Sequence, residues 1–283
     1  MKTSFKKAVL AALAVGTLGF GATAAVAAPV VNQWGYQVET GFSAWTPVSA
    51  APGAVTPSDP NVVLSALAGS PIYTKLSWGV DTPVTPGFQQ SALGVTGTVV
   101  GNDLFTNGPF VDGATLTHFN FDINDPNNVS LETATLVTAL FLTAIDPPIG
   151  SPDPLGPIFF DIGFLETQNN PISGSCQFGG APPCDDIFVL LNAADLVSFF
   201  DFSGETYKVT LQLSGLQDLT DAQCAAVGAE DGCVGLFTEE GQENDFTAQF
   251  KIELVDTQVP EPGTLALIGL AIAGLGLRRK LSA

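Results

Sequence analysis

The sequence predicts an all-β protein, an antiparallel β-sandwich of the jelly-roll kind, with a helical segment at each end of the chain. Three observations favour this fold. Apolar and polar residues alternate along several short segments, no long stretch of the middle has helical periodicity, and Gly and Pro separate the segments. The 283 residues include 30 Gly and 20 Pro, which is typical of a chain with many turns.

Two segments in the last third of the chain show the alternation most clearly. Tyr207–Leu213 and Phe246–Leu254 place aromatic or aliphatic residues at every second position, so each predicts a strand with one buried face. Ser203-Gly204 precedes the first of them and can turn a hairpin from Val197–Phe202.

Three other segments are apolar on both faces. Leu131–Ile145 is rich in Thr, Val, Leu and Phe, as expected for a central strand of a sandwich, and Ile158–Phe164 and Ile187–Leu191 predict two more strands. Residues 47–60 contain four Pro, and we expect them to form a loop. The one short helix that the middle predicts is Leu219–Val227.

The first 27 residues have the pattern of a Sec export signal. Three lysines precede the apolar run Ala8–Phe20, and Ala25-Val26-Ala27 supplies a small-residue cleavage site. The run is short for a transmembrane helix and is followed at once by small and polar residues. We therefore expect cleavage after Ala27, with an uncleaved anchor as the alternative.

The last 25 residues, 259–283, form a second element of this kind. Val259-Pro260-Glu261-Pro262 precedes the apolar stretch Gly263–Leu277, and Arg278-Arg279-Lys280 follows it. Fifteen helical residues span roughly 23 Å, a little less than a bilayer core. The sequence thus predicts a single transmembrane helix after a proline break, with its positive end in the cytoplasm. Residues 28–258 remain as the secreted β domain.

The order of Pro-Glu-Pro, a short apolar helix and a terminal Arg cluster resembles the PEP-CTERM sorting signal. The resemblance implies recognition by an exosortase, a membrane cysteine protease-transpeptidase that removes the tail and releases or transfers the protein outward. It also implies a Gram-negative host that makes extracellular polysaccharide. The chain would be anchored transiently in the inner membrane and would then reach the cell surface or the medium.

The charge balance becomes more acidic once both ends are removed. The full chain has nine Lys and Arg against 28 Asp and Glu. Six of the nine lie in the two ends, so only Lys75, Lys208 and Lys251 remain, and the net charge is about −25. Such a protein repels nucleic acid and anionic lipid and favours cations.

The four cysteines lie in two local pairs, Cys176 with Cys184 and Cys224 with Cys233. Four cysteines allow three connectivities. In an exported chain we favour two loop-closing disulfides, one within each pair. Zinc is the alternative, although the spacings lack C-x-x-C and the one histidine is distant.

Three short motifs lie in the middle of the chain: Leu76-Ser77-Trp78-Gly79, Gln90-Ser91-Ala92-Leu93 and Thr117-His118-Phe119-Asn120. Together they resemble the THxN family of PEP-CTERM proteins. The resemblance in spacing extends to about Phe250 and includes the segments 184–186 and 238–240. Phe121-Asp122-Ile123 stands where the family usually has a second Asn and Pro-Ile. The function of that family is not established, so the resemblance implies no activity.

His118 is the sole histidine, on an expected strand with Thr117 and Asn120. It could contact a ligand or a metal. We favour a structural role, in which the imidazole bonds a backbone carbonyl and Asn120 turns the chain at the end of the strand. One histidine excludes a His-rich metal site, and no G-x-S-x-G motif supports a Ser–His–Asp triad.

An oxygen-rich loop follows this motif and includes Asp122, Asn124 and Asp125. Calcium takes six to eight oxygens, so the loop could bind it outside the cell, although the full EF-hand spacing is absent. Asx turns explain the same residues without an ion. Weaker calcium candidates are the acidic pairs Asp185-Asp186 and Glu239-Glu240.

These observations predict a non-catalytic surface or extracellular matrix protein, associated with exopolysaccharide or biofilm, that needs no cofactor unless calcium binds. A secreted carbohydrate-active enzyme is one alternative, although so acidic a chain always offers a pair of carboxylates. A calcium-dependent polysaccharide-binding module is another. Trp34, Trp45 and Trp78 could stack on sugar rings, but in a β domain Trp more often fills the core.

Overall fold

The computed structural model describes residues 29–49, 54–79, 90–121, 123, 130–169, 171, 173–179, 181–192 and 196–255. The expected signal peptide and transmembrane helix lie outside these residues. The described part of the chain is all-β and mostly antiparallel, as the sequence predicts. Its strands are β1 Gln33–Pro47, β2 Val55–Pro60, β3 Tyr73–Trp78, β4 Ser91–Val95, β5 Thr98–Phe105, β6 Val111–Asn120, β7 Leu131–Asp146, β8 Leu155–Leu165, β9 Asp186–Leu190, β10 Val197–Phe202, β11 Glu205–Leu213, β12 Gln217–Asp218, β13 Val234–Thr238 and β14 Gln242–Leu254, and its helices are α1 Val62–Ala68 and α2 Asp221–Ala226.

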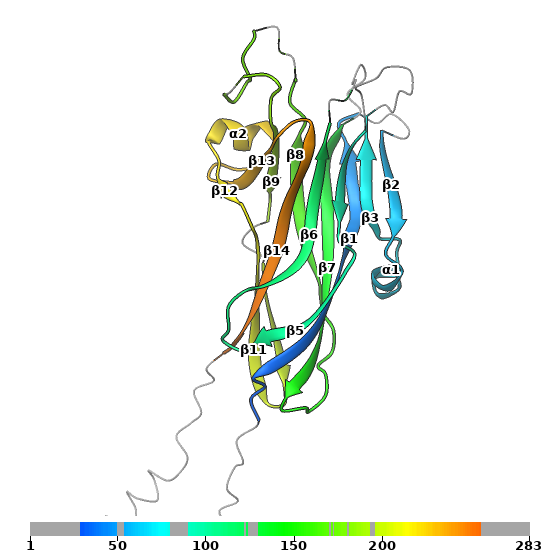
Figure 1. Ribbon diagram of the computed structural model, residues 1–283, viewed down its shortest axis with the longest axis vertical. Helices are drawn as coiled ribbons and strands as arrows, with labels where there is room; N and C mark the ends of the chain where they lie inside the picture. Colours follow the sequence, from blue (N-terminus) through cyan, green and yellow to red (C-terminus); the bar gives the residue numbers. More distant parts are fainter. Residues whose placement is uncertain are drawn as a thin grey trace, which may run out of the picture.

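The described strands form one sheet in the order β10-β11-β14-β6-β4-β3-β1-β7-β8-β9-β13-β12, with β2 added beside β3 and β5 beside β1. The long strands run along the long axis of the molecule (Figure 1). The sheet curls, because β6 and β8 are far apart in this order and yet Leu116 of β6 and Phe160 of β8 belong to one buried cluster. The separation into the two sheets of a jelly-roll sandwich stays a prediction.

Two large clusters fill the interior. The first contains Phe42, Trp78 and Leu131 and packs one half of the curled sheet against the other. The second surrounds Trp34, which meets Tyr207 edge-on at a centroid distance of 5.1 Å. Alternation of apolar residues at period two supplies both clusters, since every second side chain of a strand points inward.

The strands with the clearest alternation are confirmed. Tyr207–Leu213 lies within β11 and Phe246–Leu254 within β14, and the two strands pair from Tyr207↔Leu254 to Leu213↔Ala248. Ser203 and Gly204 have φ values of 54° and 85° and join β10 to β11. A two-residue turn with both φ values positive matches the twist of a hairpin.

The expected loop at 47–60 is wrong in its second half, where Val55–Pro60 forms β2. This strand pairs with β3 alone, and a strand at an edge tolerates Pro because one side of it makes no ladder. The sequence analysis also missed α1, a seven-residue helix. Asn61 caps it by accepting a hydrogen bond from the Leu64 N–H at 3.0 Å, but so short a helix gives no readable period.

Both predicted disulfides are present, Cys176–Cys184 and Cys224–Cys233, with Cα–Cα distances of 5.5 and 5.8 Å. The first closes the loop that leads into β9, and the second joins α2 to the start of β13. Of the two helices in the described residues, neither is long enough to cross a bilayer.

Candidate metal centre

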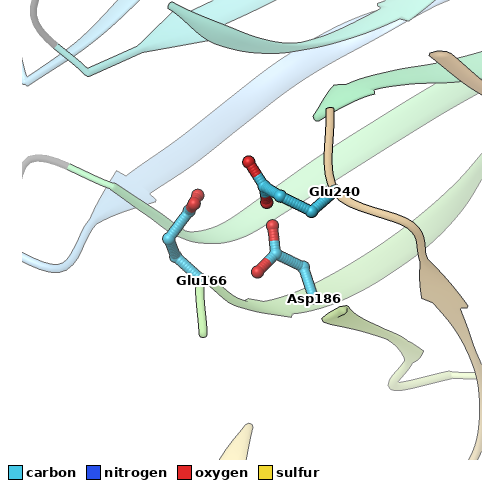
Figure 2. A group of neighbouring side chains, drawn as sticks. All are labelled: Glu166, Asp186 and Glu240. Carbon is cyan, nitrogen blue, oxygen red and sulfur yellow. The ribbon is translucent and has the colours of Figure 1, made fainter. Parts of the chain in front are cut away.

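Three carboxylates from separate parts of the chain converge where β8, β9 and β13 meet. Glu166 follows the last residue of β8, Asp186 opens β9, and Glu240 lies in the turn between β13 and β14. The register places Leu165 opposite Ile187 and Asp186 opposite Thr238, which brings the three positions to one end of the sheet. Figure 2 shows the three side chains pointing toward one another, and one oxygen from each lies within 4.8 Å of the others.

Asp186 is fully buried, and the loop before β9 holds it in place. Its Oδ1 accepts a hydrogen bond from the Thr167 N–H at 2.7 Å. The Thr167 hydroxyl donates to the carbonyls of Cys184 and Asp185, so the disulfide loop and the carboxylate share one anchor. The second oxygen of Asp186, Oδ2, has no hydrogen-bond partner among the described residues.

The three carboxylates form a concentrated negative charge. Burial raises the pKa of Asp186 well above its ordinary value, and the nearby charges of Glu166 and Glu240 raise it further, against the opposing effect of the Thr167 N–H. The lysines lie elsewhere in the described structure: Lys75 sits over the Phe119 ring, and Lys208 and Lys251 pair with Glu253. Like charges in a buried place either hold protons or bind a cation.

The end of β6 is fastened to the turn that carries Glu240. Asn120 donates from Nδ2 to the Thr238 carbonyl at 3.0 Å, and its own carbonyl accepts from the Gly241 N–H at 2.8 Å. Gly241 has a φ of 79°, which suits glycine and lets the turn reverse directly after Glu240. Asn120 Oδ1 and Thr238 Oγ1 are buried and have no partner among the described residues.

His118 lies two residues before Asn120 and is enclosed by aromatic rings. It stacks on Trp78 at a centroid distance of 5.6 Å and meets Phe164 edge-on at 5.1 Å. Burial lowers the pKa of His118 to about 3, so the ring is neutral. The expected bond to a carbonyl is wrong for the described part of the chain, where neither ring nitrogen finds a partner.

Trp78 links this histidine to the carboxylates. Its Nε1–H donates to Glu166 Oε2 at 3.0 Å, while its ring face contacts His118. Trp78 and Trp34 are fully buried, and Trp45 packs against the core, so the described surface offers neither of the first two for stacking on a sugar. The remaining motif residue, Thr117, faces the other side of β6 and donates to Asp245 at 2.6 Å.

Sequence reasoning found part of this site. Of the weaker calcium candidates, Asp186 and Glu240 meet in the centre, while Asp185 is partly exposed, with its pKa raised by burial and by the charge of Glu239. Glu166 was missed, because nothing in its own segment distinguishes it. The preferred calcium loop, with Asp122, Asn124 and Asp125, lies outside the described residues, as do the sorting residues Val259 to Pro262, Arg278 and Arg279.

Comparison with known proteins supports the C-terminal prediction. Residues 258–280 match the PEP-CTERM protein-sorting motif. No curated protein matches the chain. The motif supports a PEP-CTERM protein, and it implies export, membrane-anchored transit and processing by an exosortase. Membership of the THxN family stays a prediction, as does the signal peptide.

Proposed function

We propose that the protein is a non-catalytic surface or extracellular matrix protein that binds a divalent cation at the centre formed by Glu166, Asp186 and Glu240. The observation that carries this proposal is the convergence of three carboxylates, of which Asp186 is fully buried and the other two are partly exposed. Two oxygens that bind one calcium ion at 2.3–2.6 Å are at most about 5 Å apart, and the separation here satisfies this limit.

The burial of Asp186 favours an ion over a polymer substrate. A glycosidase needs both of its carboxylates to reach a sugar, whereas Asp186 has no exposed surface. A cation reaches such a site without its polymer, and it relieves the repulsion that raises the pKa of Asp186. The acidic exterior then suits contact with exopolysaccharide through further cations, which is the matrix role that the sorting signal favours.

Thermal unfolding of the exported chain tests the cation centre. The protein is stripped with EDTA and then melted with and without millimolar calcium. A ligand at 100 times its Kd stabilises the folded state by about 2.7 kcal/mol, so we expect a clear rise in Tm. Asp186→Asn and Glu240→Gln should abolish the rise.

The control is Asp153→Asn, which removes an exposed carboxylate in the connection between β7 and β8, at the other end of β8 from Glu166. It should keep the full response, because it changes the surface charge by the same amount. An equal Tm in calcium and EDTA, or an equal response in Asp186→Asn, would show that the centre binds no cation. Hydrolysis of the host's exopolysaccharide that Glu166→Gln abolishes would show an enzyme instead.

A further inference from the structure

We infer that the centre is an all-oxygen site for calcium in which Asn120 and Thr238 supply ligands beyond the three carboxylates. This inference rests on the proposed function and names the ion. It also gives the end of the Thr117–Asn120 segment a role, namely to complete a cation site that the strands β8, β9 and β13 begin.

The position of Thr238 is fixed by the ladder. Thr238 lies directly opposite Asp186 between β13 and β9, and residues opposite each other in a sheet project to the same face with Cβ atoms about 5 Å apart. Thr238 Oγ1 and Asp186 Oδ2 are both buried, and neither has a hydrogen-bond partner among the described residues. Buried polar atoms are normally satisfied, so two neighbouring exceptions indicate a shared ligand.

Asn120 reaches the same place from the other half of the curled sheet. Its Nδ2 is held at the Thr238 carbonyl, which fixes the orientation of the amide, and its Oδ1 is buried without a described partner. The hydrogen bond from the Gly241 N–H to the main-chain carbonyl of Asn120 holds the end of β6 against the turn that carries Glu240. A bound ion would therefore join β6 to β9 and the β13–β14 turn.

The donor types select the ion. Calcium takes six to eight oxygens from carboxylates, amides and water, and the centre offers three carboxylates, one amide oxygen and one hydroxyl. Zinc prefers nitrogen and sulfur. His118 is held between Trp78 and Phe164 and is not part of the converging group, and all four cysteines are in disulfides.

Trp78 makes the site observable. Its Nε1–H is 3.0 Å from Glu166 Oε2, so an ion bound by Glu166 lies close to the indole. Terbium(III) takes the same oxygen ligands as calcium and emits when a nearby Trp is excited. The full-length chain in detergent is titrated with terbium, and calcium, magnesium and zinc are then added as competitors. We expect calcium to displace terbium at a concentration at least tenfold below that of zinc or magnesium.

Two ligand variants separate coordination from packing. Asn120→Ala should weaken calcium binding at least tenfold, and Asn120→Asp should restore it, because Asp keeps the oxygen. If Asn120 only fastens the turn through Nδ2, Asn120→Asp should weaken calcium binding as much as Asn120→Ala does, and the inference is then wrong. Thr238→Val keeps shape and backbone and loses only Oγ1, so weaker calcium binding in this variant supports coordination and unchanged binding contradicts it.

The matched control is Asn192→Ala. Asn192 also bonds two backbone groups, the Asp161 N–H and the Phe159 carbonyl, but it lies just after β9, at the other end of that strand from Asp186. Its calcium affinity should equal that of the wild type. If calcium binds Asn120→Ala and Thr238→Val as tightly as the wild type, the inference fails and the proposed function stands. The same holds if zinc displaces terbium at a lower concentration than calcium does. If no ion gives Trp78-sensitised emission and none raises Tm, both fail.

Discussion

His118 is a titratable side chain whose protonation is suppressed by its surroundings. Both ring nitrogens lack a described partner, and Trp78 and Phe164 cover the ring. An imidazole in such a place contributes aromatic packing, and its polar atoms cost free energy rather than supply it. Replacement by an aromatic hydrocarbon should therefore preserve the fold.

We predict that His118→Phe removes a pH dependence of stability. The pKa of His118 is about 3 in the folded protein against 6.5 for the ordinary side chain. As the pH falls, the unfolded chain therefore binds this proton before the folded protein does. The free energy of unfolding is thus highest above pH 6.5 and decreases as the pH drops below 6.5. At pH 5 the wild type should have lost about 2 kcal/mol relative to the variant.

Urea unfolding of both proteins at pH 7.5 and 5.0, with calcium saturating, measures this difference. At pH 7.5 His118→Phe should be as stable as the wild type or more stable. A wild type and a variant that lose equal free energy on acidification would show that His118 is not held neutral.

When no cation is bound, Asp186 should give the protein a dependence of stability on pH that is opposite in sign to that of His118. Because its pKa is raised in the folded state from 3.8, the folded protein binds the proton more tightly, and this stabilisation is lost as the pH rises above about 4. Relative to Asp186→Asn, the wild type in EDTA should lose about 1.4 kcal/mol for each unit by which the pKa is raised. Calcium should remove the loss.

Denaturant curves at pH 4.5 and 7.5, in EDTA and in calcium, test the prediction. Parallel curves for wild type and Asp186→Asn in EDTA would contradict it.

At the scale of elements, the two disulfides form a natural comparison. They close loops of almost equal length, with sequence separations of 8 and 9, so each should stabilise the fold by roughly 2–3 kcal/mol. Cys184 adjoins Asp185-Asp186, and its carbonyl accepts from Thr167, which also holds Asp186. Cys224 and Cys233 pack instead beside α2 in a separate apolar cluster.

We predict that the two double Ser variants lower Tm by similar amounts and differ in calcium affinity. Cys176→Ser with Cys184→Ser should weaken calcium binding, because the loop before Asp186 gains freedom. Cys224→Ser with Cys233→Ser should leave it unchanged. Terbium titration of both variants below their Tm measures the difference, and equal affinities would show that the first disulfide does not hold the site.

The sequence predicts an element well only where the residue pattern of that element indicates which of its faces is buried. β11 and β14 are predicted for this reason, because their apolar residues alternate at period two and so indicate the buried face. α1 is not predicted, because seven residues are too few to show a helical period. β2 is not predicted either, because its prolines are typical of a loop as well as of an edge strand.

The metal centre is less predictable still. Glu166 meets Asp186 only because β8, β9 and β13 are neighbours in one particular register. A slip of one residue would turn Asp186 to the other face, and the local sequence contains no signal that excludes it.

At the scale of the whole molecule, the centre and the C-terminal end of β14 lie at opposite ends of the β domain (Figure 1). β14 starts next to the turn of Glu240 and runs 13 residues to Leu254, close to the last described residue. An extended strand rises about 3.3 Å per residue, so the chain leaves the β domain roughly 40 Å from the centre (Figure 1). The cation site therefore lies at the other end of β14 from the point where the described chain ends.

This separation makes processing and cation binding independent, and each has its own variant. We predict that Pro260→Ala with Pro262→Ala prevents removal of the tail in the native host, because the proline break of the sorting motif is lost. The intact mass of the membrane fraction should then include Gly263–Ala283. Asp186→Asn should instead be processed normally.

The control is a second Pro-x-Pro sequence, Pro152-Asp153-Pro154, in the connection between β7 and β8. Its double Ala variant should appear in the medium or on the outer surface at the same mass as the wild type. If the wild type keeps residues 263–283 and stays in the inner membrane, the tail is a simple anchor. If Asp186→Asn is retained while folded, cation binding and release are coupled across the length of β14, and the independence argued from this geometry is wrong.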